Sequence, residues 1–193
     1  MQTLLKQAGI VQGQKVLDIG FRDLRELQEI ASLVSPTGHV LGIDINPDSI
    51  ETAQKELKNL SLPNIFVKTG SILAIPANNH AFDLILCKGM LHEIKNLRKA
   101  IVEMTRVCKP AGLISIMDFQ RFSRLKFMVY RFKVRFSRQQ CDDIHPGFSQ
   151  EQLRNLLSEQ DLKELDYQLL PDIWQLGSIK VNPFLLRAEK RTK

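Results

Sequence analysis

The sequence predicts an α/β fold with a mostly parallel sheet, and two patterns in its first quarter carry this prediction. A short apolar run at residues 16–19 ends at Gly20, and a second apolar run ends at Asp44. The stretch between them repeats apolar residues at the spacing of one helix face, namely Leu24, Leu27, Ile30, Ala31 and Val34. Such a strand–helix–strand unit predicts a ligand crevice at the carboxyl ends of its strands.

The same alternation continues along the chain. Further strands are predicted at residues 64–68, 82–87 and 113–119, and two closing strands at 162–170 and 183–188, joined by a loop that holds Trp174. Helices are predicted near residues 2–9, after Asn46-Pro47, over 97–108 with a stop at 109–112, and after Ser149. We therefore expect a single domain over residues 1–193.

Composition excludes several classes of protein. The chain has 193 residues, of which 44% are hydrophobic and 25% charged, as in ordinary globular domains. No apolar run reaches the length of a membrane span, and the N-terminus lacks the pattern of a secretory signal, so a cytoplasmic location is expected. The three cysteines lack paired spacing, which argues against a disulfide framework.

Four stretches occur in an order and at spacings that resemble the class I S-adenosylmethionine-dependent methyltransferases, the broad group that includes the ubiquinone and menaquinone methyltransferases. They read KVLDIG at 15–20, GIDI at 42–45, FDLILC at 82–87 and MTRVCKPAGL at 104–113. The resemblance covers residues 10–119. It implies a Rossmann-like, seven-stranded, mostly parallel sheet with helices on both faces and the last strand antiparallel.

The resemblance also implies S-adenosylmethionine as cofactor and a small or lipid-like methyl acceptor. Asp44 is placed to bind the ribose, because a carboxylate at a strand tip accepts hydrogen bonds from both hydroxyls. The other implied cofactor contacts are Ile45 and Ile72 for the adenine, Ser71 for its amino edge, and Asp18, Gly20, Phe21 and Cys87 toward the methionine end.

His92 is the candidate catalytic residue, as a base or as a group that orients the substrate. It follows the fourth strand, and an imidazole titrates near neutral pH. The alternative is a histidine that only lines or caps the following helix. The candidate substrate contacts are Lys88, His92, Arg124 and Tyr130.

One departure from the family pattern affects the cofactor site. Relatives have glycines at alternate positions after the first strand, where the backbone approaches the methionine half of the cofactor. Here Gly20 is kept, but Arg22 and Leu24 replace the next two glycines. A Cβ at such a position clashes or pushes the loop outward, so an altered site is expected. Arg22 either binds the carboxylate of an aminoacyl ligand or pairs with Asp18 or Asp23 and fills the site.

The net charge of +6 originates in one segment, which contains no Asp or Glu. Its cations are Arg121, Arg124, Lys126, Arg131, Lys133, Arg135 and Arg138. Residues 120–147 lie between the fifth strand and the next helix, where the resembling enzymes have substrate-binding insertions, so the resemblance implies a substrate-binding or lid insertion here. The alternatives are a surface helix at 121–138 that meets an anionic membrane or a nucleic acid, and a helix packed on the domain with solvated arginines.

Two other functions remain open. The first is a methyltransferase-like protein without catalysis, which binds a partner through the basic segment or the altered pocket. The second is a nucleic-acid methyltransferase, although the Pro-Pro-Tyr-type signature of many such enzymes is missing after the fourth strand. Cys141, Asp142, Asp143 and His145 match no zinc spacing, so no metal site is predicted.

Overall fold

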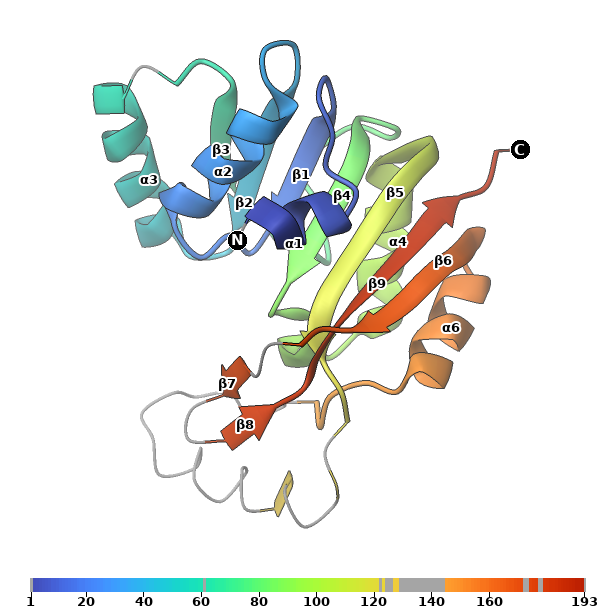
Figure 1. The fold of residues 1–193 in the computed structure, drawn as a ribbon. Coiled ribbons are helices and arrows are strands. Elements are labelled where there is room, and N and C mark those ends of the chain that lie inside the picture. The colour runs from blue at the N-terminus through green and yellow to red at the C-terminus, as the bar shows by residue number, and fades with distance from the viewer. Residues whose placement is uncertain are drawn as a thin grey trace.

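The computed structural model describes residues 2–60, 62–121, 123, 127–128, 145–171, 174–176 and 179–192. At its centre is a seven-stranded sheet in the order β3-β2-β1-β4-β5-β9-β6 (Figure 1). The strands are β1 (Lys15–Ile19), β2 (His39–Asp44), β3 (Ile65–Thr69), β4 (Phe82–Lys88), β5 (Cys108–Phe119), β6 (Leu162–Leu169) and β9 (Pro183–Lys190). Strands β1 to β5 pair in parallel, whereas β9 is antiparallel to both β5 and β6. The predicted Rossmann-like fold with an antiparallel last strand is confirmed.

Helices cover both faces of this sheet. Helices α1 (Gln2–Gln7), α2 (Leu24–Val34) and α3 (Pro47–Leu60) pack on one face, and α4 (Leu97–Val107) and α6 (Gln150–Ser158) pack on the other. Figure 1 shows α1 and α2 in front of the sheet and α4 behind it. Successive residues of a strand point to opposite faces, so Val16 joins the first apolar layer and Leu17 the second.

The predicted stop at residues 109–112 is a bulge inside β5. Phe82 pairs with Cys108 and Leu84 with Leu113, so the residues between Cys108 and Leu113 loop out of register. Ala111 takes a φ of 58° in this bulge. The strand therefore begins directly after α4, five residues before the predicted start.

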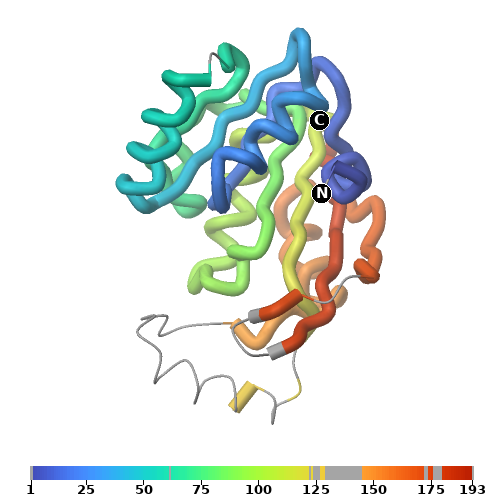
Figure 2. The backbone as a smooth tube through the Cα atoms, turned by 60° about the vertical axis from the view of Figure 1, so that its left-hand side comes forward, coloured from blue at the N-terminus to red at the C-terminus, as the bar shows by residue number. Residues whose placement is uncertain are grey.

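The connection from β6 to β9 contains a hairpin that the sequence does not predict. Strands β7 (Trp174–Leu176) and β8 (Ile179–Val181) pair antiparallel. Figure 2 shows this hairpin beyond the lower end of the sheet, below the end of β4. Trp174, expected in a loop, is therefore part of a strand close to the carboxyl ends of the parallel strands.

The two ends of the predicted insertion are held together. Phe148 N donates to Phe119 O at 3.1 Å, and Arg121 N donates to Phe148 O at 3.1 Å. Most of residues 121–138 lies outside the described residues, as do the predicted substrate residues Arg124 and Tyr130 and the cluster at 141–143. In the described part of the chain, no helix is long and apolar enough to cross a membrane.

Candidate functional site

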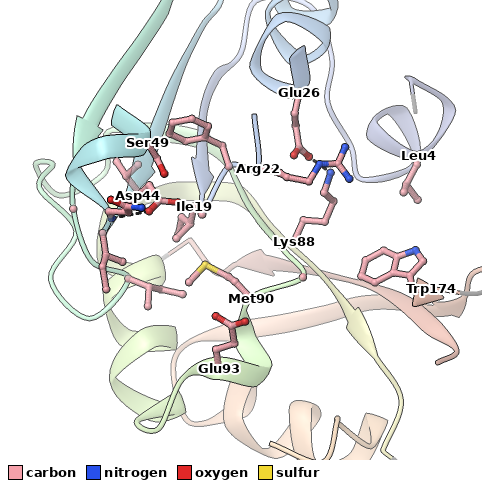
Figure 3. Close-up of a pocket in the computed structure, with 18 of the residues that line it drawn as sticks. Leu4, Ile19, Arg22, Glu26, Asp44, Ser49, Lys88, Met90, Glu93 and Trp174 are labelled. Atoms are coloured by element: carbon pink, nitrogen blue, oxygen red, sulfur yellow. Dashed lines mark hydrogen bonds and ion pairs between the residues drawn. The ribbon is translucent and has the colours of Figure 1, made fainter. Parts of the chain in front are cut away.

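A cleft of about 790 Å³ opens at the carboxyl ends of β1, β2 and β4 (Figure 3). β2 and β3 lie on one side of β1 and β4 on the other, so the strand order reverses here. Open parallel sheets bind ligands at such a point. The lining comes from the loops after β1, β2, β3 and β4, from helices α1, α2 and α3 and from the β7–β8 hairpin, and includes Phe21, Arg22, Asp44, Lys88, Met90 and Trp174.

The residues that replace the family glycines do not fill this cleft. Phe21 is 4% exposed and packs toward Gly42, where an added Cβ would lie 2.8 Å from the Phe21 ring. Leu24 is 6% exposed and joins the apolar layer beneath α2. The Arg22 side chain is 70% exposed, and its Nε lies 3.4 Å from Oδ2 of Asp23. The loop avoids a clash because its two apolar side chains turn into the core.

Gly20 is needed where it stands. Its φ is 71°, which favours glycine, and an added Cβ would lie 2.7 Å from the thioether sulfur of Met90. Met90 therefore packs directly against Gly20, and both residues line the cleft, in which Figure 3 shows the Met90 side chain. The single glycine that the loop retains is the one with a left-handed backbone.

One end of the cleft is formed where β2 ends. The Asp44 Oδ1 accepts a hydrogen bond from Asn46 N at 2.7 Å, and Asn46 Oδ1 accepts from Asp48 N at 3.0 Å in the first turn of α3. Ile45 is 69% exposed, while Ile72 is buried, and both line the cleft. The cap of α3 therefore fixes the loop that carries the predicted ribose carboxylate.

Ser71 is not brought into the cleft lining, although its neighbours Gly70 and Ile72 are. Its hydroxyl oxygen accepts a hydrogen bond from Leu73 N at 3.1 Å and so stabilises its own loop. Cys87 is also absent from the lining, because it is fully buried in the layer under α4. Burial raises the pKa of the Cys87 thiol well above its usual range, so this thiol stays protonated.

The other end of the cleft carries buried charges. Glu26 of α2 and Lys88 of β4 form an ion pair in which the side chains are 1% and 15% exposed. Asp18, predicted to contact the cofactor, is 1% exposed and is absent from the cleft lining, and its Oδ2 has no hydrogen-bond partner among the described residues. Burial raises the pKa of Asp18 to about 7, which the charge of Lys88 opposes. Burial also lowers the pKa of Lys88, and Asp18 counteracts this shift.

His92 belongs to the 3-10 turn η1 (Leu91–Glu93) and is 4% exposed. Its Nδ1 lies 3.0 Å from Oδ1 of the fully buried Asp118, and its backbone N donates to Asp118 Oδ2 at 3.1 Å. Its Nε2 lies 3.7 Å from Oε1 of Glu93, which lines the cleft. The imidazole itself is not in the lining, so it reaches the cleft through Glu93.

Several residues of this site escaped the sequence analysis. They are Glu26, Asp118 and Trp174. Two of them leave a signal in the sequence. Glu26 stands four residues before Ile30 on the apolar row of its helix, and Asp118 interrupts an apolar strand run. A carboxylate on a buried face indicates a partner, which the sequence alone does not identify.

Comparison with known proteins agrees with a methyltransferase fold. Residues 10–168 match the family model described as a methyltransferase domain. The chain is 24% identical over 132 residues to a demethylmenaquinone methyltransferase of Halalkalibacterium halodurans, covering 66% of this chain and 54% of the relative. It is 28% identical over 115 residues to a ubiquinone/menaquinone biosynthesis C-methyltransferase of Pasteurella multocida, covering 59% and 43%.

Among solved structures, the fold is similar to that of a SAM-dependent methyltransferase from Aquifex aeolicus. The TM-score is 0.71 at 21% identity, over 98% of this chain and 88% of that one. This likeness supports the fold. The chain spans about half the length of the curated relatives it matches.

Proposed function

The chain belongs to the class I S-adenosylmethionine-dependent methyltransferase family, and from this premise we propose that it transfers a methyl group to a small or lipid-like acceptor. When bound, S-adenosylmethionine supplies a methyl group on a sulfonium, so the leaving group is already activated. The protein then has to hold donor and acceptor in line and to exclude water. A dedicated catalytic constellation is not required.

The observation that supports this proposal most is the open cleft at the carboxyl ends of β1, β2 and β4. Phe21 and Leu24 turn into the core, and the space between Asp44 and Lys88 stays accessible. Asp44 would hold the ribose and Ile45 and Ile72 the adenine. The unpaired Oδ2 of buried Asp18 fits a ligand that brings a hydrogen-bond donor to the other end, because buried polar atoms normally have partners.

We propose that Glu93 takes a proton from the acceptor. Glu93 lines the cleft, His92 lies behind it, and Asp118 orients His92 through Nδ1. In this arrangement Nδ1 of His92 is bonded to Asp118, which fixes the ring and leaves Nε2 on the side of Glu93. His92 and Asp118 would therefore act as positioning residues. A base at this place suits an acceptor that loses a proton, such as a phenol.

Quinone precursors are the first acceptors to test, because the relatives from Halalkalibacterium and Pasteurella are named as menaquinone and ubiquinone methyltransferases. A short-chain demethylmenaquinol, incubated with the protein and S-adenosylmethionine, would gain one CH₂ in mass. His92→Gln would lower the turnover while leaving the affinity for S-adenosylhomocysteine within about twofold. Unchanged turnover in Glu93→Gln would contradict the proposed base.

Calorimetric titration with S-adenosylhomocysteine tests the cofactor site without an acceptor. We expect micromolar binding, weakened at least tenfold in Asp44→Ala, because a carboxylate that holds two hydroxyls contributes about 1.5–3 kcal/mol. Glu51→Ala is the matched control, since Glu51 is an exposed carboxylate of α3 paired with Lys55. Absence of heat at millimolar ligand would favour the alternative function, in which the chain binds a partner and does not catalyse methyl transfer.

The basic segment 121–138 gives a second candidate function, contact with an anionic surface, and it lies largely outside the described residues. Its charge supports salt-dependent binding to anionic lipid, which would bring a lipid-like acceptor to the cleft. Arg131→Ser with Arg135→Ser would weaken binding to anionic vesicles. Preferential binding to RNA instead would favour a nucleic-acid substrate.

A further inference from the structure

The end of the cleft opposite Asp44 carries both signs of charge, and the side chains of Glu26 and Lys88 there are largely buried. We propose that Glu26, Lys88 and Arg22, with Asp18 behind them, bind the amino-acid end of the methyl donor as a zwitterion. They would replace the backbone amides that a glycine-rich turn offers in relatives. This inference rests on the proposed function and names the residues that hold one half of its cofactor.

Three separate elements bring these groups together. Asp18 of β1 is paired with Leu86 of β4, and Lys88 follows two residues later on the same face. Glu26 enters this face from the first turn of α2, whose N-cap is Asp23. In Figure 3 the side chains of Glu26 and Lys88 point toward each other. The Glu26–Lys88 pair is therefore fixed by the sheet and a helix, whereas Arg22 lies on the loop between β1 and α2.

Burial makes this cluster costly unless it binds something. An ion pair with side chains 1% and 15% exposed loses much of its hydration, and such pairs seldom add net stability. Beside it, the buried Oδ2 of Asp18 lacks a donor among the described residues. An ammonium group from a ligand would supply that donor and give the second carboxylate a cation.

The cations at the same end of the cleft can bind the carboxylate of the ligand. Lys88 lies at the cleft, and Arg22 is close enough for its charge to lower the pKa of Lys88. The Arg22 guanidinium is exposed beside Asp23, so it can turn to a ligand carboxylate at little desolvation cost. A purely anionic group would meet Glu26 and Asp18 as well, which repel it. In a zwitterion, the ammonium group can interact with the carboxylates of Glu26 and Asp18, and the carboxylate group can interact with Lys88 and Arg22.

The position along the cleft agrees with this assignment. Asp44 and Lys88 lie on opposite sides of Ile19 and Met90 (Figure 3). Ile19, Gly20 and Met90 line the same cleft as these two residues, so a ligand that extends from Asp44 to Lys88 would contact them. Adenosine alone would leave the charged end unused.

The test compares two ligands that share the adenosine half. S-adenosylhomocysteine carries the amino-acid end, and 5′-methylthioadenosine lacks it. By calorimetry, we expect the wild-type chain to prefer S-adenosylhomocysteine at least tenfold. Glu26→Leu with Lys88→Met should abolish this preference while the affinity for 5′-methylthioadenosine stays within about twofold. Arg22→Gly should reduce the preference several-fold, and Lys55→Met, at an exposed ion pair, should leave it unchanged.

Each result has one meaning. A wild-type chain that binds neither ligand contradicts the proposed function, whereas binding of both with equal affinity contradicts only this inference. A double variant that keeps the full preference also overturns the inference. If that variant fails to fold, the wild-type chain is titrated with an S-adenosylhomocysteine analogue lacking the α-amino group. Undiminished affinity for that analogue then overturns the inference.

Discussion

The two ends of the cleft are built in different ways. At the Asp44 end, strand β2 stops, its last carboxylate holds the next turn through Asn46 N, and Ile45 stays 69% exposed. At the Lys88 end, groups from β1, β4 and α2 meet with Asp18 and Glu26 each 1% exposed. The first end is a product of local turn chemistry, and the second is a product of packing. Their responses to mutation should therefore differ.

The largest difference is expected in stability. Lys88→Met leaves Glu26 buried without its cation, and removing one partner of a buried pair costs about 3–5 kcal/mol. Lys55→Met breaks the exposed Glu51–Lys55 pair on α3 and should cost about 0.5 kcal/mol or less. Urea denaturation of both variants measures the two free energies of unfolding.

A double variant distinguishes the loss of one charge from the loss of both. Glu26→Leu with Lys88→Met replaces both charges by apolar groups of similar size, which is nearly neutral in comparable cases. It should therefore unfold at a urea concentration close to that of the wild-type chain. Equal costs for Lys88→Met and Lys55→Met would mean that water reaches the Lys88 end, and the contrast between the two ends would fail.

The same contrast separates the features that the sequence predicts from those that it does not. The strand tips that carry Gly20 and Asp44 follow from apolar periodicity, because a buried parallel strand and its terminal carboxylate are adjacent in the chain. The sequence also predicts the cap at Ser149, whose hydroxyl accepts from Gln152 N at 3.2 Å. These features depend on neighbours within a few residues.

Other features depend on contacts between distant segments. Glu26 and Lys88 are 62 residues apart, and His92 and Asp118 are 26 apart. The bulge in β5 and the β7–β8 hairpin depend on pairing partners that no local pattern specifies. The turn of Phe21 into the core depends on the space over Gly42. A sequence shows that such side chains are unusual, but not what they meet.

The second prediction concerns pH. The pKa of Asp18 rises from 3.8 to about 7 on folding, so the folded chain keeps a proton that the unfolded chain releases. Its contribution to stability is fully present below pH 4 and is lost as the pH rises through 7. Relative to Asp18→Asn, the wild-type chain should lose about 2 kcal/mol of unfolding free energy between pH 5 and pH 7. Urea denaturation at several pH values measures both slopes, and parallel curves would contradict the burial of this carboxyl.

The third prediction addresses the opposite end. Ile45→Ala removes an exposed side chain, so the free energy of unfolding should stay within about 0.5 kcal/mol. The affinity for 5′-methylthioadenosine should fall by about 1 kcal/mol, because the adenine would no longer cover these carbons. Val102→Ala, at a 40% exposed side chain of α4, is the control. Calorimetry would exclude Ile45 from the adenine site if both variants bind equally.

The smallest effect is expected where the departure from the family is most visible. Arg22 does not have a positive φ, so Arg22→Gly relieves no backbone strain. It removes an exposed contact with Asp23 and adds freedom to the unfolded chain, which together should cost about 0.5 kcal/mol. A thermal melt would detect a shift of a few degrees at most. A clear gain in stability would mean that the loop is strained at this residue.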